Sequence, residues 1–150
     1  MAKILVADDE ADLEMLIKQK FRQKIREQQY EFIFAINGND ALEKIVQHPD
    51  IDIVLSDINM PEMDGFEATR QIIAHENSRG LPHTPIIAMT ANAIRGDREA
   101  CLEAGMDDYV AKPFLLETLC ASFDRWLPGD DSGTLNGMRT MAADHQQTRV

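Results

Sequence analysis

Short apolar segments alternate with longer amphipathic segments along most of this chain, and that alternation restricts its fold more than any other feature. The short segments are rich in β-branched residues and stop at polar or charged residues, which is typical of buried strands. They cover residues 3–7, 30–36, 51–56, 85–89 and 108–111. Because strands this apolar need cover on both faces, the pattern predicts a parallel sheet between two layers of helices.

The segments between the strands carry apolar residues at helical spacing. Five helices are predicted, over residues 11–26, between Asn37 and His48, and over residues 65–75, 93–104 and 114–127. Leu16 and Val46 are expected to face the core, and residues 76–84 are expected to form a polar connection. Right-handed crossovers between five such units give a doubly wound α/β sheet.

Residues 1–127 are long enough for one domain with a full hydrophobic core. Residues 128–150 differ, because they are rich in Gly, Asp, Ser, Thr and Gln and have no periodic apolar face. We predict that residues 128–150 are a disordered tail or the remnant of a linker.

Acidic residues dominate the charge of the chain. Asp and Glu total 26 against 15 Lys and Arg, so the net charge is −11. Such a surface repels nucleic-acid phosphates and argues against direct nucleic-acid binding, while it is compatible with a divalent cation or a basic partner. The chain has no signal-peptide pattern and no apolar run of membrane-spanning length, and Cys101 and Cys120 suit reduced thiols, so a cytoplasmic location is expected.

The residues that follow the strands are the candidates for chemistry, because open α/β sheets bind ligands beyond the carboxyl ends of their strands. Asp8 and Asp9 follow the first strand, Asp57 the third, Thr90 the fourth and Lys112 the fifth. If the strand order is 2-1-3-4-5, the first and third strands are neighbours. The three carboxylates then converge, with the lysine and the threonine approaching from the other side.

Three carboxylates at one site repel each other and need a compensating charge. A hard divalent cation such as Mg²⁺ with oxygen ligands supplies it, and Lys112 adds another positive charge. This combination suits phosphoryl transfer, in which positioning and charge neutralisation provide most of the catalysis. Asp57 is then the candidate nucleophile, forming an aspartyl phosphate.

The same residues carry a resemblance. In order and spacing, Asp8-Asp9, Asp57, the loop 60–65, Thr90-Ala91 and Lys112-Pro113-Phe114 resemble the response regulator receiver family of two-component signalling over residues 3–127. The segment 89–114 is especially similar to receivers attached to hybrid sensor kinases. The resemblance implies a flavodoxin-like fold and a phosphoprotein that accepts a phosphoryl group and is not otherwise an enzyme.

The resemblance also implies a set of ligands and a donor. Asp57 would take its phosphoryl group from a phosphohistidine on a histidine kinase or a histidine phosphotransfer protein. The implied Mg²⁺ ligands are Asp9, Asp57 and the backbone carbonyl of Asn59, with Asp8 acting through water.

A conformational switch is implied in the same way. Thr90 and Lys112 would hold phosphoryl oxygens, and the rotamer of Tyr109 would follow Thr90. The peptide bond before Pro113 would be cis. The output surface would act on partners as a monomer or as a weak dimer linked to phosphorylation.

Three other functions remain open at this stage. An aspartate-based phosphatase uses the same nucleophile, but it generally has a second aspartate where this chain has Asn59. A flavodoxin-like nucleotide or flavin binder needs a phosphate-binding loop after the first strand, where this chain has Asp8-Asp9-Glu10. A degenerate receiver would act as a constitutive interaction module.

Two further groups of residues stand outside the predicted site. His48, His75, His83 and His145 are scattered, and we interpret them as solvated. The basic run 18–26 is interpreted as a solvated helix face, with a docking role as the alternative. Residues 20–29 look longer than the corresponding part of the family, which bears on any docking surface there.

Overall fold

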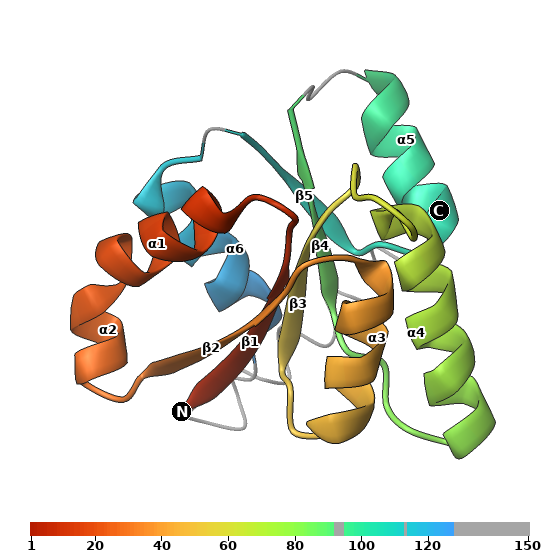
Figure 1. Cartoon of the computed structure of the whole chain (residues 1–150), viewed down its shortest axis with the longest axis horizontal. Helices are drawn as coiled ribbons and strands as arrows, with labels where there is room; N and C mark the ends of the chain where they lie inside the picture. The colour runs from red at the N-terminus through yellow and green to blue at the C-terminus, as the bar shows by residue number, and fades with distance from the viewer. Residues whose placement is uncertain (92–94, 113, 128–150) are drawn as a thin grey trace.

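The computed structural model describes residues 1–91, 95–112 and 114–127, and its centre is a five-stranded parallel sheet (Figure 1). The strands are β1 (Ala2–Ala7), β2 (Tyr30–Ala35), β3 (Ile53–Asp57), β4 (Ile86–Thr90) and β5 (Asp108–Ala111). Their order is β2-β1-β3-β4-β5, and every neighbouring pair is parallel. The predicted doubly wound, flavodoxin-like sheet is therefore confirmed.

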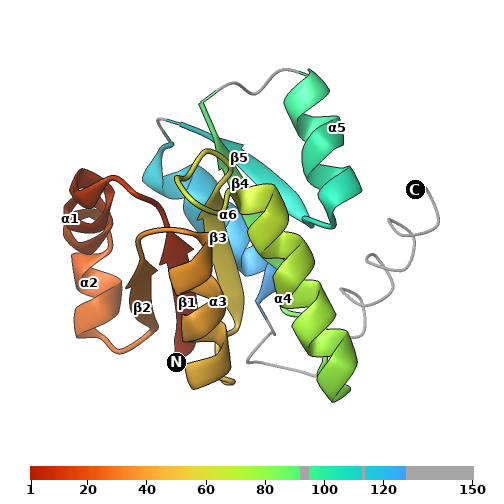
Figure 2. The same ribbon diagram turned by 45° about the vertical axis from the view of Figure 1, so that its right-hand side comes forward.

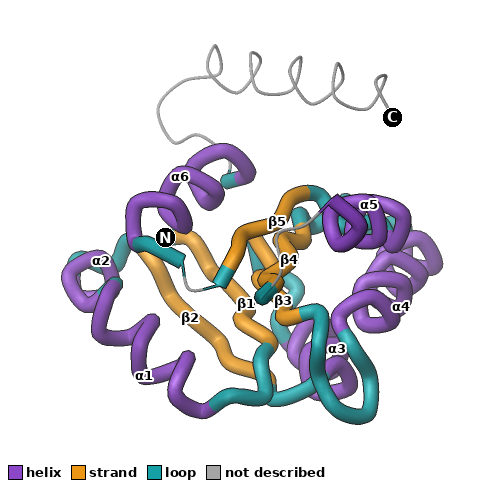
Figure 3. The backbone as a smooth tube through the Cα atoms, turned by 90° about the horizontal axis from the view of Figure 1, so that it is seen from above, coloured by secondary structure: helices purple, strands orange, loops and turns teal. Residues whose placement is uncertain are grey.

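Helices cover both faces of the sheet (Figure 3). They are α1 (Ala11–Lys20), α2 (Arg22–Arg26), α3 (Gly38–Gln47), α4 (Gly65–Arg79), α5 (Arg95–Ala104) and α6 (Leu116–Trp126). The helices α1, α2 and α6 lie on one face, and α3, α4 and α5 lie on the other. Figure 2 shows α3 and α4 side by side, in agreement with their direct contacts.

The core consists of two apolar layers, because successive side chains of a strand point to opposite faces. In β1, Ile4 and Val6 pack towards α1 and α6, while Leu5 and Ala7 pack towards the helices of the other face. Every residue of β3 and β4 is buried. This explains why the central strands have no polar face in the sequence.

Within the described residues there are six helices and not the predicted five, because the predicted helix 11–26 is interrupted at Phe21. The backbone there has φ −102° and ψ 16°, outside helical values. The Phe21 side chain is almost fully buried, and its ring packs against those of Tyr30 and Phe123. We attribute the interruption to this ring, which enters the core where the chain changes from α1 to α2.

The helix α4 extends to Arg79, beyond the predicted end at residue 75. Gly80 ends it in the left-handed conformation (φ 65°), and the N–H of Leu81 donates to the carbonyl of Glu76 at 2.9 Å. This is the ordinary glycine end of a helix. Gly80 was therefore the signal that the sequence interpretation overlooked.

His83 is not merely solvated, contrary to the prediction. Its Nδ1 lies 3.1 Å from Glu76 Oε1 and its Nε2 lies 2.8 Å from Asp107 Oδ2. The cluster joins the end of α4 to the segment before β5. The prediction failed because Glu76 lies 7 residues and Asp107 24 residues from His83, and neither separation signals a contact before the chain is folded.

Two residues that were expected in the core are exposed. Leu16 is 39% exposed and Val46 is 52% exposed, so neither faces the core as predicted. Cys101 is buried and Cys120 is partly buried. Within the described residues, no helix is long and apolar enough to cross a membrane. The predicted start of the helix at residue 93, the peptide bond before Pro113 and the tail 128–150 lie outside the described residues.

Candidate functional site

The fold brings the two predicted acidic strand ends together. Asp8 follows β1 and Asp57 is the last residue of β3, and these strands pair with Ala7 opposite Ser56. One carboxylate oxygen each from Asp8, Asp9 and Asp57 lies within 4.8 Å of the others. Asp8 and Asp57 are buried, whereas Asp9 is exposed, so the acidic cluster has one side open to solvent.

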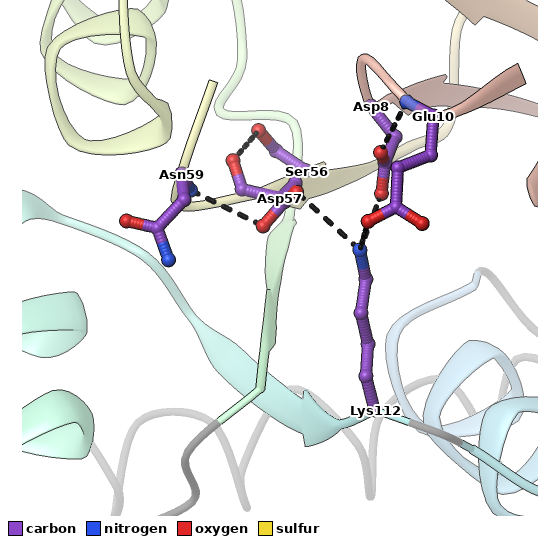
Figure 4. A network of polar contacts seen from close by, with 6 residues as sticks. All are labelled: Asp8, Glu10, Ser56, Asp57, Asn59 and Lys112. Carbon is purple, nitrogen blue, oxygen red and sulfur yellow. Dashed lines mark hydrogen bonds and ion pairs between the residues drawn. The ribbon is translucent and has the colours of Figure 1, made fainter. Parts of the chain in front are cut away.

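Lys112 reaches this cluster from the end of β5 (Figure 4). Its Nζ lies 2.7 Å from Asp8 Oδ2 and 3.3 Å from Asp57 Oδ2. It also lies 3.7 Å from Glu10 Oε1. Glu10 was not among the predicted site residues, although its position directly after Asp8-Asp9 was the available signal.

Burial and neighbouring charges shift the protonation of the site. Burial raises the pKa of Asp57, and the nearby Asp8 carboxylate raises it further, while the N–H of Asn59 and the ammonium group of Lys112 partly oppose the rise. For Lys112, burial lowers the pKa, but the hydrogen bond to Asp8 and the attraction of Asp57 outweigh it, so its pKa is raised. The lysine therefore stays charged beside the carboxylates.

The loop between β3 and α4 packs closely around Asp57. The N–H of Asn59 donates to Asp57 Oδ1 at 3.1 Å. A Cβ atom at Gly65 would lie 2.3 Å from the carbonyl oxygen of Asp57, so only glycine fits there. The Asn37 side chain donates to Glu62 at 2.7 Å, which ties the loop to the start of α3.

Thr90 lies on β4, the strand next to that of Asp57, and Tyr109 lies on β5, one strand further along the sheet. Thr90 is the buried last residue of β4, one position beyond Met89, which pairs with Asp57. The N–H of Lys112 donates to the carbonyl of Thr90 at 2.7 Å. Tyr109 on β5 is partly buried, and the guanidinium of Arg98 lies 6.0 Å from the centre of its ring. The fold thus places Thr90 at the carboxyl end of β4 and Tyr109 on the adjoining strand β5, while their switching roles stay predictions.

The donor set fits a hard divalent cation. Three carboxylates within reach of one another offer the oxygen ligands that Mg²⁺ prefers. A cation bound between them would offset their mutual repulsion. The backbone N–H of Asn59 already contacts Asp57, whereas the predicted use of its carbonyl as a ligand stays a prediction.

Comparison with known proteins assigns the chain to a protein family. The model of the response regulator receiver domain matches residues 4–124. Hybrid signal transduction histidine kinase H of Dictyostelium discoideum is 39% identical over 83% of this chain, which covers 9% of that protein. The chain therefore spans only a small part of the curated relatives that it matches.

Solved structures agree with the family match. The receiver domain of sensor histidine kinase PA1611 from Pseudomonas aeruginosa PAO1, described with a magnesium ion in its active-site cleft, is 38% identical with a TM-score of 0.71. The alignment covers 83% of this chain and 96% of that one. Chemotaxis protein CheY4 of Vibrio cholerae is 29% identical with a TM-score of 0.72, over 85% of this chain and 99% of that one. These matches favour the receiver interpretation over the nucleotide or flavin binder.

Proposed function

The chain belongs to the response regulator receiver domain family, and we propose that Asp57 is the residue on which it accepts a phosphoryl group. The observation that carries this proposal is the position of Asp57 at the end of β3, beside Asp8 and within 3.3 Å of Lys112 Nζ. A carboxylate nucleophile beside a cation and a metal-binding cluster is the chemistry that phosphoryl transfer requires.

In the proposed reaction, a carboxylate oxygen of Asp57 attacks the phosphorus of a phosphohistidine. The new P–O bond forms as the P–N bond breaks, and the imidazole nitrogen leaves with its electron pair. Lys112 moves from Asp8 and Asp57 towards a phosphoryl oxygen, whose added charge attracts its ammonium group. Mg²⁺ held by Asp9, Asp57 and the carbonyl of Asn59, with Asp8 acting through water, would neutralise charge on the phosphoryl oxygens.

The proposed output is a change in a protein-interaction surface. Phosphorylation adds negative charge and acceptor oxygens at Asp57, and the Thr90 hydroxyl donates to them. Tyr109 then occupies the space that Thr90 leaves, which alters the surface of α5, β5 and α6. The phosphoryl group biases an equilibrium between two states of this surface.

The remaining parts of the proposal concern context. Residues 1–127 act as the receiver in the cytoplasm, and residues 128–150 are a tail or linker. The partner is a histidine kinase or a histidine phosphotransfer protein, and the receiver catalyses only its own phosphorylation and dephosphorylation. Its net charge of −11 supports the absence of direct nucleic-acid binding.

Incubation with acetyl phosphate and Mg²⁺ tests the proposal, with intact mass as the measurement. The wild-type chain gains one phosphoryl group, and Asp57→Asn gains none because the amide is a poor nucleophile. Asp12→Asn is the matched control, since Asp12 is exposed in the first turn of α1. An Asp57→Asn protein that still gains a phosphoryl group would contradict the assignment. If Asp12→Asn also fails to gain one, substitution itself impairs the protein, and the loss in Asp57→Asn does not identify the phosphorylated residue.

A further inference from the structure

A pocket of about 540 Å³ lies between α1, α2 and the start of β2, far from Asp57 along the sheet. Tyr30, which lines it, is the first residue of β2, whereas Asp57 is the last residue of β3. Because the strands are parallel, Tyr30 lies at the amino ends of the strands and Asp57 lies at their carboxyl ends. The pocket is therefore separate from the proposed phosphorylation site.

The rim of this pocket is basic. Lys18, Arg22 and Arg26 line it and are exposed, and Glu31 is the one carboxylate among its lining residues. Lys18 pairs with Glu14 at 2.7 Å, whereas within the part of the chain that the structure describes neither the Arg22 nor the Arg26 side chain forms a hydrogen bond or ion pair. The rim is thus a local positive surface on a chain whose net charge is −11.

The inner part of the pocket is apolar. Ile25, Tyr30 and Phe32 line it, and Phe32 and Ile25 are only partly buried. The strand β2 is at the edge of the sheet and pairs only with β1 among the described strands. An apolar surface beside an open strand edge and a basic rim combines the elements that recognise an extended peptide.

We propose that this pocket docks an acidic peptide segment of a partner protein. An apolar side chain of the peptide packs against Ile25, Tyr30 and Phe32, and flanking carboxylates bind Arg22 and Arg26. Arginine suits this role because its planar fork of donors matches a carboxylate. The short helix α2 supplies both arginines, so the segment that looks longer than in the family provides the basic side of the surface.

An anionic membrane is the other partner that a basic and apolar surface suggests. Two features favour the peptide. Ile25, Tyr30 and Phe32 line a hollow and are buried or partly buried, which leaves Met1 as the one strongly exposed apolar residue of the lining. The net charge of −11 also repels an extended anionic lipid surface from most of the molecule.

A fluorescein-labelled peptide of alternating Glu and Leu tests the proposal by fluorescence anisotropy. We expect Arg22→Glu and Arg26→Glu each to weaken binding by about tenfold or more, because each replaces an attraction with a repulsion. Lys20→Glu is the matched control, because it makes the same change in charge at an exposed residue of α1 that does not line the pocket. We expect this control to change the affinity by about threefold or less.

Two further measurements separate specific docking from simple attraction. Replacing Leu with Ser in the peptide should weaken binding by about tenfold, since the apolar contacts are lost. Asp57→Asn should leave peptide binding unchanged, which makes this test independent of the proposed function. The proposal is overturned if the wild-type chain does not bind the peptide, or if Lys20→Glu weakens binding as much as Arg22→Glu. It is also overturned if the Ser peptide binds as well as the Leu peptide, or if anionic vesicles displace the bound peptide.

Discussion

Lys112 holds the candidate site together at the scale of single residues. Its ammonium group contacts Asp8 and Asp57, which come from the ends of two different strands. Both carboxylates are buried, so their repulsion is weakly screened by solvent. The lysine offsets this repulsion in the free protein and is close enough to bind a phosphoryl oxygen in the product.

Lys112→Met keeps the unbranched side chain up to the ε position and removes the charged ammonium group. We expect the rate of phosphorylation by acetyl phosphate to fall by about tenfold or more, because developing charge on the phosphoryl group loses a partner. The free energy of unfolding should fall by about 1–3 kcal/mol without Mg²⁺. Intact mass against time and urea unfolding measure the two effects, and a wild-type rate would contradict the proposed role.

Gly65 is required by space and not by an unusual backbone conformation. In Gly65→Ala, the new Cβ would meet the carbonyl oxygen of Asp57 at 2.3 Å and the Cα of Ile58 at 2.8 Å. We expect a loss of about 1–3 kcal/mol in the free energy of unfolding and slower phosphorylation, because the backbone of Asp57 must move.

Gly80→Asn is the comparison for Gly65→Ala. Gly80 has a left-handed backbone with open space around it, and asparagine tolerates that conformation. Gly80→Asn should therefore change the free energy of unfolding by about 0.5 kcal/mol or less. Equal losses of stability in the two variants, measured by urea unfolding, would contradict the steric explanation.

At the scale of elements, the connection between α4 and β4 is held by buried and partly buried acidic groups. Glu76 Oε2 accepts from the N–H of Thr84, and Asp107 Oδ2 accepts from the N–H of Ile86, both at 2.8 Å. His83 lies between the two carboxylates. The hydrogen bond to Asp107, and further attraction by Asp107 and Glu76, raise the pKa of His83 to about 9 despite its partial burial.

This raised pKa makes stability depend on pH. The folded protein binds the proton of His83 more tightly than the unfolded chain does, whose pKa is near 6.5. The stabilisation is therefore complete below about pH 6.5 and is lost as pH rises through about 9. After discounting for solvent screening of this partly exposed group, we expect it to amount to about 1–2 kcal/mol.

Urea unfolding of His83→Gln from pH 6 to 10 measures this contribution. The difference in stability from wild type should shrink as pH rises across that interval. His75→Gln is the control, because the His75 side chain forms no hydrogen bond or ion pair with a described residue. A pH-independent difference for His83→Gln would show that the histidine does not stabilise the fold through its charge.

The elements themselves were largely predictable, and the failures have physical causes. Strand positions follow from apolar runs, because buried strands require them. The interruption at Phe21 depends on the packing of its ring against Tyr30 and Phe123. The spacing of apolar residues along one helix carries no information about these contacts with other elements. The end of α4 was signalled by Gly80, but the polar residues before it concealed the last turn.

At the scale of the whole molecule, the sheet separates two surfaces of different charge. The acidic cluster lies at the carboxyl ends of the strands, and the basic pocket lies at the start of β2. The parallel order of the strands fixes this separation. Binding at the pocket therefore need not compete for space with a phosphate donor at Asp57.

The candidate site could be predicted because the strand order places chain-distant strand ends side by side. Asp8 and Asp57 follow from that order because β1 and β3 are neighbours, whereas Lys112 follows β5 and reaches both carboxylates with its long side chain. Glu10 was signalled only by its position directly after Asp8-Asp9, and the partners of His83 depend on side-chain directions in the folded protein. The pocket also depends on how α2 packs beside β2, which the sequence pattern does not specify.

The most direct test of the central claim is to locate the phosphoryl group itself. The chain is phosphorylated with acetyl phosphate, reduced with borohydride to convert an aspartyl phosphate to homoserine, digested and sequenced by mass spectrometry. We predict homoserine at position 57, dependent on Mg²⁺ and absent from Asp57→Asn. Homoserine at Asp8 or Asp9, or a product that forms equally without Mg²⁺, would contradict the account.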